Sequence, residues 1–518
     1  MKYYRSLPLI IFSVTLIYYT IFNYGGIRSP DSETVFRTTE SLLNRNEFAV
    51  PKAINWQNFG LAKGIDNNRY SIFGPAQSIL AIPLLEFAYY LKKNSFQIID
   101  SNYIPISYHV LSDNRDAGLY VLEDKRPPNL SGQFERFIVS FFNVIVGAFS
   151  ALFLYFILLR ITESKTISFY TTLVYSFGSL IFSYTGTFFS EPLCTLFIIL
   201  SFLFIIKNEK VQQISKIKNQ NYLYSGLFLG LAITSHISAV LSVPFYYMFM
   251  LGQKFKNKNE LKDFAVSSLY FTSGLTIFCI LLFYYNYTRF GNVFETGRSA
   301  DQLIHYAIYS NPLPAFYGLL FGSGKGLFIY SPIVLLAVIF WKSFHRGFPH
   351  LSIAILGMFF IRLLFIASRS DWHGGFCLGP RYFVIIIPFL FVPIAIGIKN
   401  ILENGNLKQF LVISLFSFLC IVQQIFFSLG EIFSYLHIIY RHQKSLGIET
   451  LANNALYLNW KYSPALYLLE YRTGPFLLKF LSINNYFLWA LMVILFTVSF
   501  SFIVAFTYVS AIDRHSES

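Results

Sequence analysis

Residues 7–33 read LPLIIFSVTLIYYTIFNYGGIRSPDSE and set the pattern for the chain. The first part, Leu7 to Tyr24, is an apolar run about long enough to cross a bilayer, since about 20 helical residues span roughly 30 Å. Two carboxylates, Asp31 and Glu33, follow this run directly. We therefore expect both acids at the membrane surface, level with the lipid headgroups. Acidic groups at this depth suggest a reaction on a substrate that is held in the membrane.

The composition indicates a membrane protein with many spans. The chain has 518 residues, of which 55% are hydrophobic and 13% are charged, and its mean hydropathy is +0.52. A soluble domain would carry about 25% charged residues. Long apolar runs recur along the chain, and because they are continuous rather than alternating they favour helices over a barrel. The sequence predicts an all-α polytopic membrane protein with about 12 transmembrane helices.

The net charge of +14 is best explained by membrane topology. Lysines concentrate in two short loops between apolar runs, at 207–218 and 254–262. Short basic loops are typical of cytoplasmic connections, so the charge indicates a lipid bilayer and no nucleic acid as partner. Lys2 and Arg5 precede the first span and no small-residue cleavage site follows it, so we expect an uncleaved span. The expected localisation is the cell membrane, with both termini cytoplasmic.

The expected spans divide a single integral membrane domain, 1–518, into four parts. These are a first outer loop at 25–135, a transmembrane core at 137–429, an outer loop at 430–485 and a last span at 486–509. Inside the core we expect spans at 137–159, 168–189, 193–206, a pair of short helices within 222–252, and 264–286, 327–341, 351–367, 382–398 and 408–429.

The sharpest polar cluster on the expected outer face runs from Asp371 to Tyr382 and reads DWHGGFCLGPRY. Its glycines allow the backbone to approach a ligand closely. Arg381 would lie at the depth of phosphate headgroups, and its fork of donors suits phosphate oxygens. The alternative is an interfacial anchor whose side chain reaches up to the headgroups.

Two other clusters leave their roles open. Residues 321–332, FGSGKGLFIYSP, lack the spacing and context of a nucleotide-binding loop, so Lys325 is either near a lipid-linked phosphate or an anchor at a helix start. Residues 285–298, YNYTRFGNVFETGR, could line an acceptor groove or cap a span.

Three smaller features complete the outer side. Glu191 lies in a turn between two apolar runs, where an ionisable group is costly and is therefore a functional candidate. His236, at the turn of the short helix pair, is expected to be a packed polar residue bonded by a neighbouring helix. The apolar stretch 74–92, which two prolines interrupt, is expected to lie in the outer interface.

The order of these features resembles that of a known family. An acid after the first span, an interfacial segment, an outer Glu-Pro turn and a short helix pair, with 285–297, 325–332 and 372–382, resemble the GT-C glycosyltransferases. These include the protein O-mannosyltransferases and the aminoarabinose transferases of lipid A. The resemblance implies a glycosyltransferase that takes a hexose or pentose from a polyprenyl-phosphate-linked donor on the outer face. The sugar would pass, with inversion, to a glycan, lipid or protein acceptor.

The resemblance also implies roles for individual residues. Asp31 matches the family's catalytic acid by position and would deprotonate the acceptor hydroxyl. Glu33 is the alternative base, because the sequence here is Asp-Ser-Glu where the O-mannosyltransferases have Asp-Glu. In a helix, acids two residues apart point about 200° away from each other, so only one can face the sugar. The remaining assignments are donor-phosphate binding by Arg381, Lys325, Arg298 and Arg369, and lining of the substrate site by Glu191, His373, Trp372 and Tyr382.

No cofactor and no metal site are predicted. A divalent metal is not excluded, because the family includes metal-dependent oligosaccharyltransferases. The main alternative function is a secondary transporter or lipid flippase, since broken helices and polar groups at depth also mark transport sites. A transporter would show two matching halves and charged residues at the midplane of the bilayer. Here the halves do not match, and the charged residues gather on the outer side. A scaffold gives no reason for acids, arginine and glycines to converge, so the sequence favours an enzyme.

Overall fold

The computed structural model describes residues 6–27, 29–50, 60–94, 132–206, 219–254, 260–298, 311–375, 377–430, 432, 435, 457–467, 503–504 and 507. Within these residues the chain is mainly helical, which confirms the helical part of the predicted fold class, although a short β hairpin departs from the all-α prediction. Loop 207–218, most of 430–485 and most of 486–509 lie outside the described residues. The number of spans and the division into domains therefore stay predictions.

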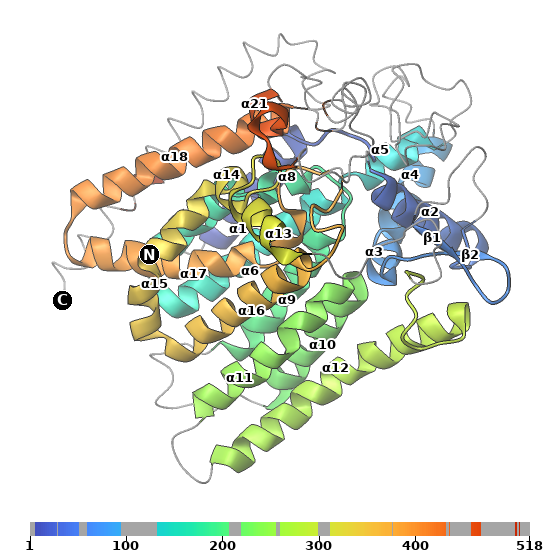
Figure 1. The fold of residues 1–518 in the computed structure, drawn as a ribbon, viewed down its shortest axis with the longest axis horizontal. Helices are drawn as coiled ribbons and strands as arrows, with labels where there is room; N and C mark the ends of the chain where they lie inside the picture. The colour runs from blue at the N-terminus through green and yellow to red at the C-terminus, as the bar shows by residue number, and fades with distance from the viewer. Residues whose placement is uncertain are drawn as a thin grey trace.

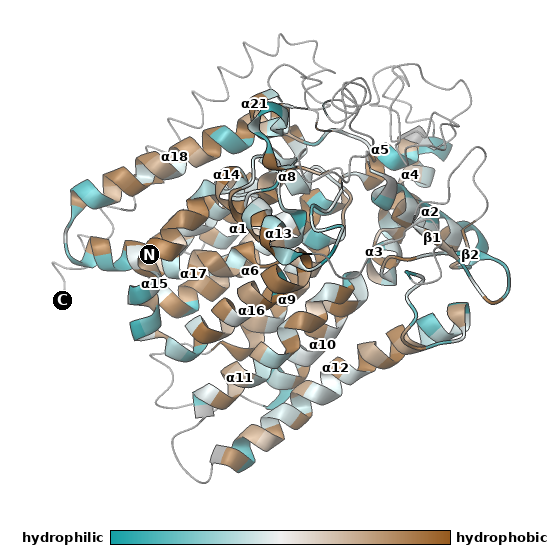
Figure 2. Ribbon diagram, in the orientation of Figure 1, coloured by the Kyte–Doolittle hydropathy of each residue, from teal (hydrophilic) through white to brown (hydrophobic). Residues whose placement is uncertain are grey.

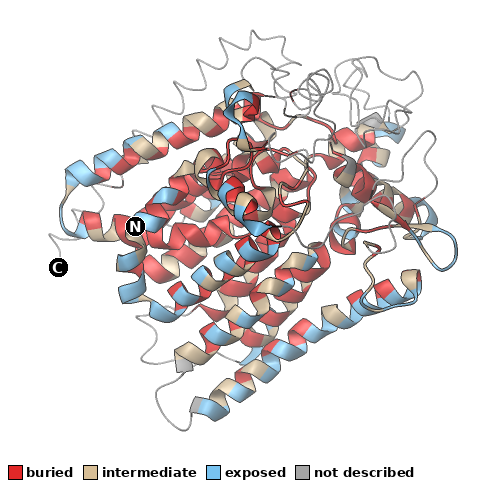
Figure 3. Ribbon diagram, in the orientation of Figure 1, coloured by how far each residue is buried: buried red, intermediate tan, exposed pale blue. Residues whose placement is uncertain are grey.

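A bundle of helices forms the body of the protein (Figure 1). Helix α6 lies inside it and packs against α1, α7, α9 and α17, and α10 packs against α9 and α12. Figure 3 shows that buried residues concentrate along these inner helices. The helices of the bundle are α1 (Leu7–Ile21), α6 (Phe142–Thr162), α7 (Lys165–Gly178), α8 (Ile181–Thr185), α9 (Glu191–Ile205), α10 (Asn219–Ser235), α11 (Val243–Lys254), α12 (Glu260–Phe290), α13 (Pro312–Phe321), α14 (Leu327–Tyr330), α15 (Leu335–Gly347), α16 (Pro349–Ala367), α17 (Ile387–Glu403) and α18 (Leu407–Leu429).

Several helices are long and apolar enough to cross a membrane. Among the described residues these are Phe134–Thr162, Leu261–Phe290, Pro349–Ala367 and Leu407–Leu429. Helix α12 is the least covered of them, with 28% of its most apolar window buried. Its outer side presents large apolar residues, and Figure 2 shows the hydrophobic colour running along it. Such a face suits contact with lipid chains.

A small cap lies at one end of the bundle, on the right of Figure 1. It consists of α2 (Pro30–Arg45), α3 (Pro75–Leu80), α4 (Ile82–Lys93), α5 (Gln133–Val139) and an antiparallel hairpin of β1 (Leu61–Lys63) and β2 (Arg69–Ser71). In the hairpin, Leu61 pairs with Ser71 and Lys63 with Arg69. The cap contacts the bundle through α3, which packs against the end of α10.

Three expected elements differ from the structure because prolines and backbone breaks divide them. The stretch 74–92 forms two helices, α3 and α4, that meet at Ala81. The expected span 168–189 stops at Gly178, because Ser179 is extended, and continues as the short α8. The expected span 327–341 is broken by a 3-10 turn, η4 (Pro332–Val334), since Pro332 has no N–H to continue a helix.

The expected pair of short helices within 222–252 is present. Helix α10 ends at Ser235, and a 3-10 helix, η3 (Ile237–Ser242), leads into α11. The turn between them exposes His236 at the end of the bundle that faces the cap. Further 3-10 turns are η5 (Arg381–Phe383) and η6 (Trp460–Tyr462), and a single helical turn, α21, spans Pro464–Tyr467.

Candidate active site

Asp31 is held at the start of α2 by local sequence. Ser29 caps the helix, and its Oγ accepts a hydrogen bond from the Ser32 backbone N–H at 3.1 Å. Pro30 occupies the first helical position, where its missing N–H costs no hydrogen bond. Asp31 and Glu33 then fall in the first turn, where the helix dipole favours negative charge. Both acids are thus fixed in one helical turn and point in different directions.

Glu33 points into the cap and away from the open space beside Asp31. It is 1% exposed and accepts hydrogen bonds from Arg136 Nε at 2.9 Å and from Arg37 Nε at 3.0 Å. Burial alone would raise the pKa of Glu33, but the charges and hydrogen bonds of Arg136 and Arg37 outweigh it and lower the pKa to about 2. Glu33 is therefore a permanent anion that ties α2 to α5.

Glu191 is positioned by the turn before α9. Asn143 Nδ2, from α6, donates to the carbonyl oxygens of Thr187 and Phe189 at 2.8 Å each. Gln77 Nε2, from α3, donates to the Phe188 carbonyl at 2.9 Å. These buried amide groups hold the turn from both sides. Glu191, the first residue of α9, therefore has a fixed position.

Arg381 follows a glycine-rich loop, 371–380, that Lys325 holds in place. Lys325 Nζ donates to the carbonyls of Gly375 and Cys377 at 2.9 and 2.7 Å. Burial lowers the pKa of Lys325, although the Cys377 side chain partly offsets this effect. The Arg381 guanidinium then lies over the rings of Phe189 and Tyr382, at 4.9 and 5.0 Å from their centroids.

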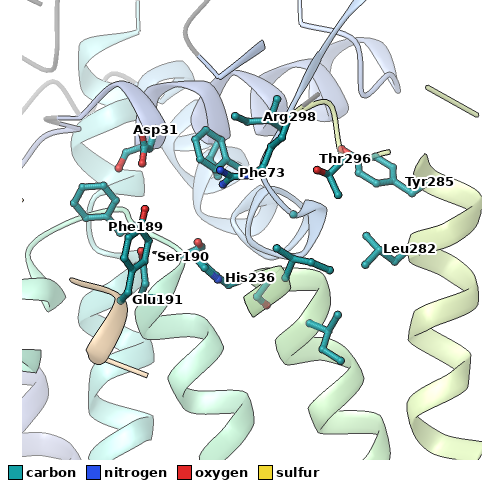
Figure 4. A pocket seen from close by; sticks show the side chains of 18 of the residues that line it. Asp31, Phe73, Phe189, Ser190, Glu191, His236, Leu282, Tyr285, Thr296 and Arg298 are labelled. Carbon is teal, nitrogen blue, oxygen red and sulfur yellow. Dashed lines mark ion pairs between the residues drawn. The ribbon is translucent and has the colours of Figure 1, made fainter. Parts of the chain in front are cut away.

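A cavity of about 720 Å³, opening included, lies between the cap and the bundle. Figure 4 shows Asp31, Phe189 and Glu191 on one side and Leu282 and Tyr285 of α12 on the other, with His236 between them. The lining residues are Asp31, Ser32, Val35, Ile72, Phe73, Gly74, Phe188, Phe189, Ser190, Glu191, Ile233, Ser235, His236, Ile237, Leu282, Tyr285, Asn286, Arg289, Thr296, Arg298, Arg381 and Tyr382.

Arg381 connects the two acids of the cavity. Its NH1 lies 2.7 Å from Asp31 Oδ2, and its Nε lies 3.5 Å from Glu191 Oε1. His236 Nε2 lies 3.8 Å from the same Glu191 oxygen. Burial alone would lower the pKa of Arg381, but Tyr382, Asp31 and Glu191 outweigh it and raise the pKa, so the guanidinium stays charged. Asp31, Arg381 and Glu191 thus form a charged centre in the cavity, whose lining also includes Arg289 and Arg298.

The structure brings together some of the site residues predicted from sequence. Asp31, Glu191, Arg381, Arg298 and Tyr382 all line the cavity. Glu33, Lys325, Arg369, Trp372 and His373 do not line it and have other partners.

The partners of the last three residues explain their positions. Arg369 Nε and NH2 contact the two oxygens of Asp371 at 2.6 and 2.9 Å. His373 stacks on Tyr457 with ring centroids 4.4 Å apart, and burial, assisted by Lys325, lowers the pKa of His373 to about 3. Trp372 is 2% exposed and also contacts the Tyr457 ring. These residues shape the loop behind Arg381.

Two cavity residues were missed or underrated in the sequence. His236 has a hydrogen-bonding neighbour, Ser238, as a packed polar residue would, and it also lines the cavity beside Glu191, which the sequence did not indicate. Arg289, at the end of α12, donates to the Ser71 carbonyl at 2.6 Å and joins the hairpin to the cavity wall. Arg289 belongs to the polar run 285–298, for which the sequence left two roles open: lining an acceptor groove or capping a span.

A second cavity, of about 580 Å³, adjoins the first and shares Ser32, Phe188 and Phe189 with it. Its described lining carries hydroxyls and backbone groups but no acidic or basic side chain. The two cavities therefore differ in charge. Among the described residues, no group of three or more His, Cys, Asp or Glu side chains is arranged to hold a metal ion.

A family model agrees with the resemblance seen in the sequence. Residues 119–293 match the family described as dolichyl-phosphate-mannose-protein mannosyltransferase. The matched stretch, which is shorter than half of the chain, contains Glu191, His236 and Arg289. It confirms the predicted resemblance to glycosyltransferases of this class. A comparison with curated proteins finds no match.

Two solved structures resemble the chain. The apo oligosaccharyltransferase of Archaeoglobus fulgidus is 11% identical, with a TM-score of 0.49 over 91% of this chain and 56% of that one. The apo form of ArnT from Cupriavidus metallidurans is 10% identical, with a TM-score of 0.48 over 89% of this chain and 76% of that one. The chain thus spans little more than half the length of the archaeal enzyme.

Proposed function

We propose that the protein is a membrane glycosyltransferase that moves a sugar from a polyprenyl-phosphate-linked donor to an acceptor hydroxyl. The observation that carries this proposal is the charged centre of Asp31, Arg381 and Glu191 in a cavity at the ends of apolar helices. Such a centre offers a base for a hydroxyl and a cation for a phosphate in one place. The family match over 119–293 supports the same chemistry.

Donor-phosphate binding falls to the arginines that line the cavity. Arg381 is permanently charged, and a guanidinium binds phosphate oxygens through two parallel hydrogen bonds. Arg298 lines the same cavity and adds a second positive charge. Lys325 and Arg369, which we expected to share this role from the sequence, support the 371–380 loop instead, because backbone carbonyls and Asp371 already occupy them.

We assign the role of general base to Asp31 rather than to Glu33. Asp31 faces the cavity, whereas Arg136 and Arg37 saturate Glu33 in the cap. In the reaction, the acceptor oxygen attacks the anomeric carbon while Asp31 takes its proton. The bond between that carbon and the phosphate oxygen breaks, and the leaving polyprenyl phosphate is stabilised by Arg381. One displacement at the anomeric carbon inverts its configuration.

The acceptor would approach through the second, uncharged cavity. Ser32, next to Asp31, belongs to both cavities, so a hydroxyl entering there comes close to the base. Because no charged side chain lines the described part of this cavity, it suits an uncharged hydroxyl-bearing acceptor. In this proposal the active site lies at the outer face of the plasma membrane.

Mass spectrometry of cell-envelope glycans tests the function. Cells that lack the protein should lose one glycan substituent, and the intact chain should restore it. The Asp31→Asn variant, expressed to the same level in the membrane, should not restore it. An unchanged glycan profile in the cells that lack the protein would contradict the proposal.

A further inference from the structure

A string of polar side chains runs from the cavity into the apolar interior of the bundle. Its innermost member is Arg362, a fully buried arginine in the C-terminal half of α16. Arg362 NH1 donates to Ser238 Oγ at 2.9 Å, and its NH2 donates to the Ser238 carbonyl at 3.2 Å. A charged side chain inside an apolar helix is costly and is retained for function. The proposed reaction makes no use of Arg362, so this group needs a role of its own.

The hydrogen bonds of Ser238 and Arg362 determine which ring nitrogen of His236 carries the proton. Ser238 Oγ lies 2.7 Å from His236 Nδ1. Arg362 can only donate, so Ser238 accepts from it and has its own hydrogen available for Nδ1. On the other side of the ring, Nε2 faces the Glu191 carboxylate, which in its ionised form can only accept. Burial raises the pKa of Glu191, and the charge of Arg381 opposes this effect and favours the ionised form. Both neighbours favour a neutral ring with the proton on Nε2, directed at the cavity.

The polar groups that meet beside Glu191 are too far apart to hydrogen-bond one another well, which leaves a gap between them. The distances from Glu191 Oε1 to His236 Nε2 and to Arg381 Nε, 3.8 and 3.5 Å, are too long for good hydrogen bonds. Arg381 Nε is buried and has no hydrogen-bond partner among the described residues. Two donors and one acceptor therefore converge without saturating each other. Buried polar groups that lack a partner point to a ligand or water.

A sugar hydroxyl matches this gap, since it accepts one hydrogen bond and donates another. On the basis of the proposed function, we propose that Glu191 and His236 form a pair that recognises a hydroxyl of the donor sugar. Ser238 and Arg362 are positioning residues for this pair, because neither lines the cavity. The Nε2–H would donate to the hydroxyl oxygen, and Glu191 would accept the hydroxyl hydrogen. The pair belongs to the donor because it shares the charged cavity with Arg381.

Binding measurements on the full-length protein in nanodiscs test this proposal. The probes are bare polyprenyl phosphate and the same carrier linked to mannose, glucose or xylose. The ratio of the two dissociation constants gives the contribution of the sugar alone. For wild type, the best sugar should tighten binding by roughly tenfold or more, as expected for hydrogen bonds to a charged group. His236→Leu and Ser238→Ala should reduce this ratio to near one.

Conservative variants separate recognition from a structural role. His236→Gln keeps an N–H near the Nε2 position and Ser238→Thr keeps the hydroxyl, so both should retain most of the sugar ratio. All four variants should bind bare polyprenyl phosphate as wild type does. An unchanged sugar ratio in His236→Leu and Ser238→Ala would overturn the inference, as would an equal loss of affinity for the bare carrier. Failure of wild type to bind either lipid would contradict the proposed function itself.

Discussion

The residue that organises the site is Arg381, because it contacts both carboxylates of the cavity. With no donor present, its positive charge lies between the Asp31 and Glu191 carboxylates and offsets part of their negative charge. A donor phosphate would compete for the same guanidinium and so free Asp31 to act as a base. Sequence alone pointed to Asp31, Glu191 and Arg381 separately. It could not show that they meet, since Asp31 and Arg381 are 350 positions apart in the chain.

Replacing Arg381 should weaken donor binding. Arg381→Ala removes the charge-assisted hydrogen bonds to phosphate, and we expect the affinity for polyprenyl phosphate to fall roughly 10- to 100-fold. Binding to the purified protein in nanodiscs measures this effect. The matched control is Arg346→Ala, which removes an exposed arginine in the last turn of α15, outside the cavity. Equal affinities of the Arg381 variant and wild type would remove Arg381 from the phosphate site.

Glu33 should contribute to stability rather than to chemistry. Its pKa is lowered from 4.5 to about 2, so its contribution is present above 4.5 and is lost as the pH falls towards 2. Glu33→Gln removes the carboxylate that pairs with the buried Arg136, and because one side of a buried ion pair is lost we expect about 3–5 kcal/mol of destabilisation. Thermal unfolding in detergent between pH 7 and pH 3 measures this. Wild type should lose Tm faster than the variant on acidification, and parallel curves would contradict the assignment.

The Arg362 string shows a limit of reading the sequence residue by residue. Arg362 is the single Asp, Glu, Lys or Arg in the apolar run 349–367, and this signal should have marked it as functional. Its partner Ser238 carries no such signal. The link from Arg362 to His236 depends on how α16 packs against η3, which only the fold reveals.

At the scale of elements, the 371–380 loop determines where Arg381 points. Gly379 adopts φ +59°, a left-handed conformation that favours glycine. It also lies against Tyr330, which is fully buried and cannot move aside. The sequence predicted close backbone approach from the glycines of this loop. It assigned that approach to a ligand, whereas Gly379 approaches the protein's own interior.

Two alanine substitutions in this loop separate backbone strain from steric clash. A Cβ at Gly379 would lie 2.8 Å from Tyr330 Cβ, whereas a Cβ at Gly375, with φ +72°, would meet nothing within 4 Å. Both variants incur a left-handed penalty of about 1–2 kcal/mol. Gly379→Ala should incur a further 1–3 kcal/mol, roughly, from overpacking. Thermal unfolding in detergent should rank Gly379→Ala below Gly375→Ala, and equal Tm values would show that the loop does not rest on Tyr330.

Helices were predictable where the chain is uniformly apolar and less so where backbone geometry intervenes. Helices α6, α12, α16 and α18 match expected spans because a long apolar run has few other stable conformations in lipid. The break at Ser179 has no strong sequence signal, because Gly178 and Ser179 are both tolerated within helices. The hairpin of β1 and β2 is also short, and its residues do not alternate clearly enough to predict strands.

On the scale of the whole molecule, the cavity lies at the cap end of the bundle, while the turn between α17 and α18 lies at the other end (Figure 1). The basic loops of the sequence predict that the second end is cytoplasmic. Loop 207–218, on which that prediction partly rests, is outside the described residues. The orientation of the site in the membrane therefore depends on a direct test.

Labelling of single cysteines in intact cells provides that test. Asn67→Cys, at the exposed tip of the hairpin, should react with a membrane-impermeant maleimide added outside. Asn404→Cys, exposed in the turn after α17, should react only after the cells are permeabilised. Unsubstituted protein measures the background from the native cysteines. The reverse pattern would place the cavity on the cytoplasmic side and contradict the topology.

The central claim is that Asp31 drives sugar transfer from a lipid-linked phosphate donor. The direct measurement uses purified protein in liposomes, radiolabelled polyprenyl-phosphate sugars and a cell-envelope acceptor fraction. Wild type should release polyprenyl phosphate and label the acceptor, and Asp66→Asn, an acid-to-amide control at the exposed tip of the hairpin, should do the same. Asp31→Asn should lower the transfer rate by about 100-fold or more while still binding polyprenyl phosphate. Transfer at the wild-type rate by Asp31→Asn, or no turnover of any donor by wild type, would contradict the account.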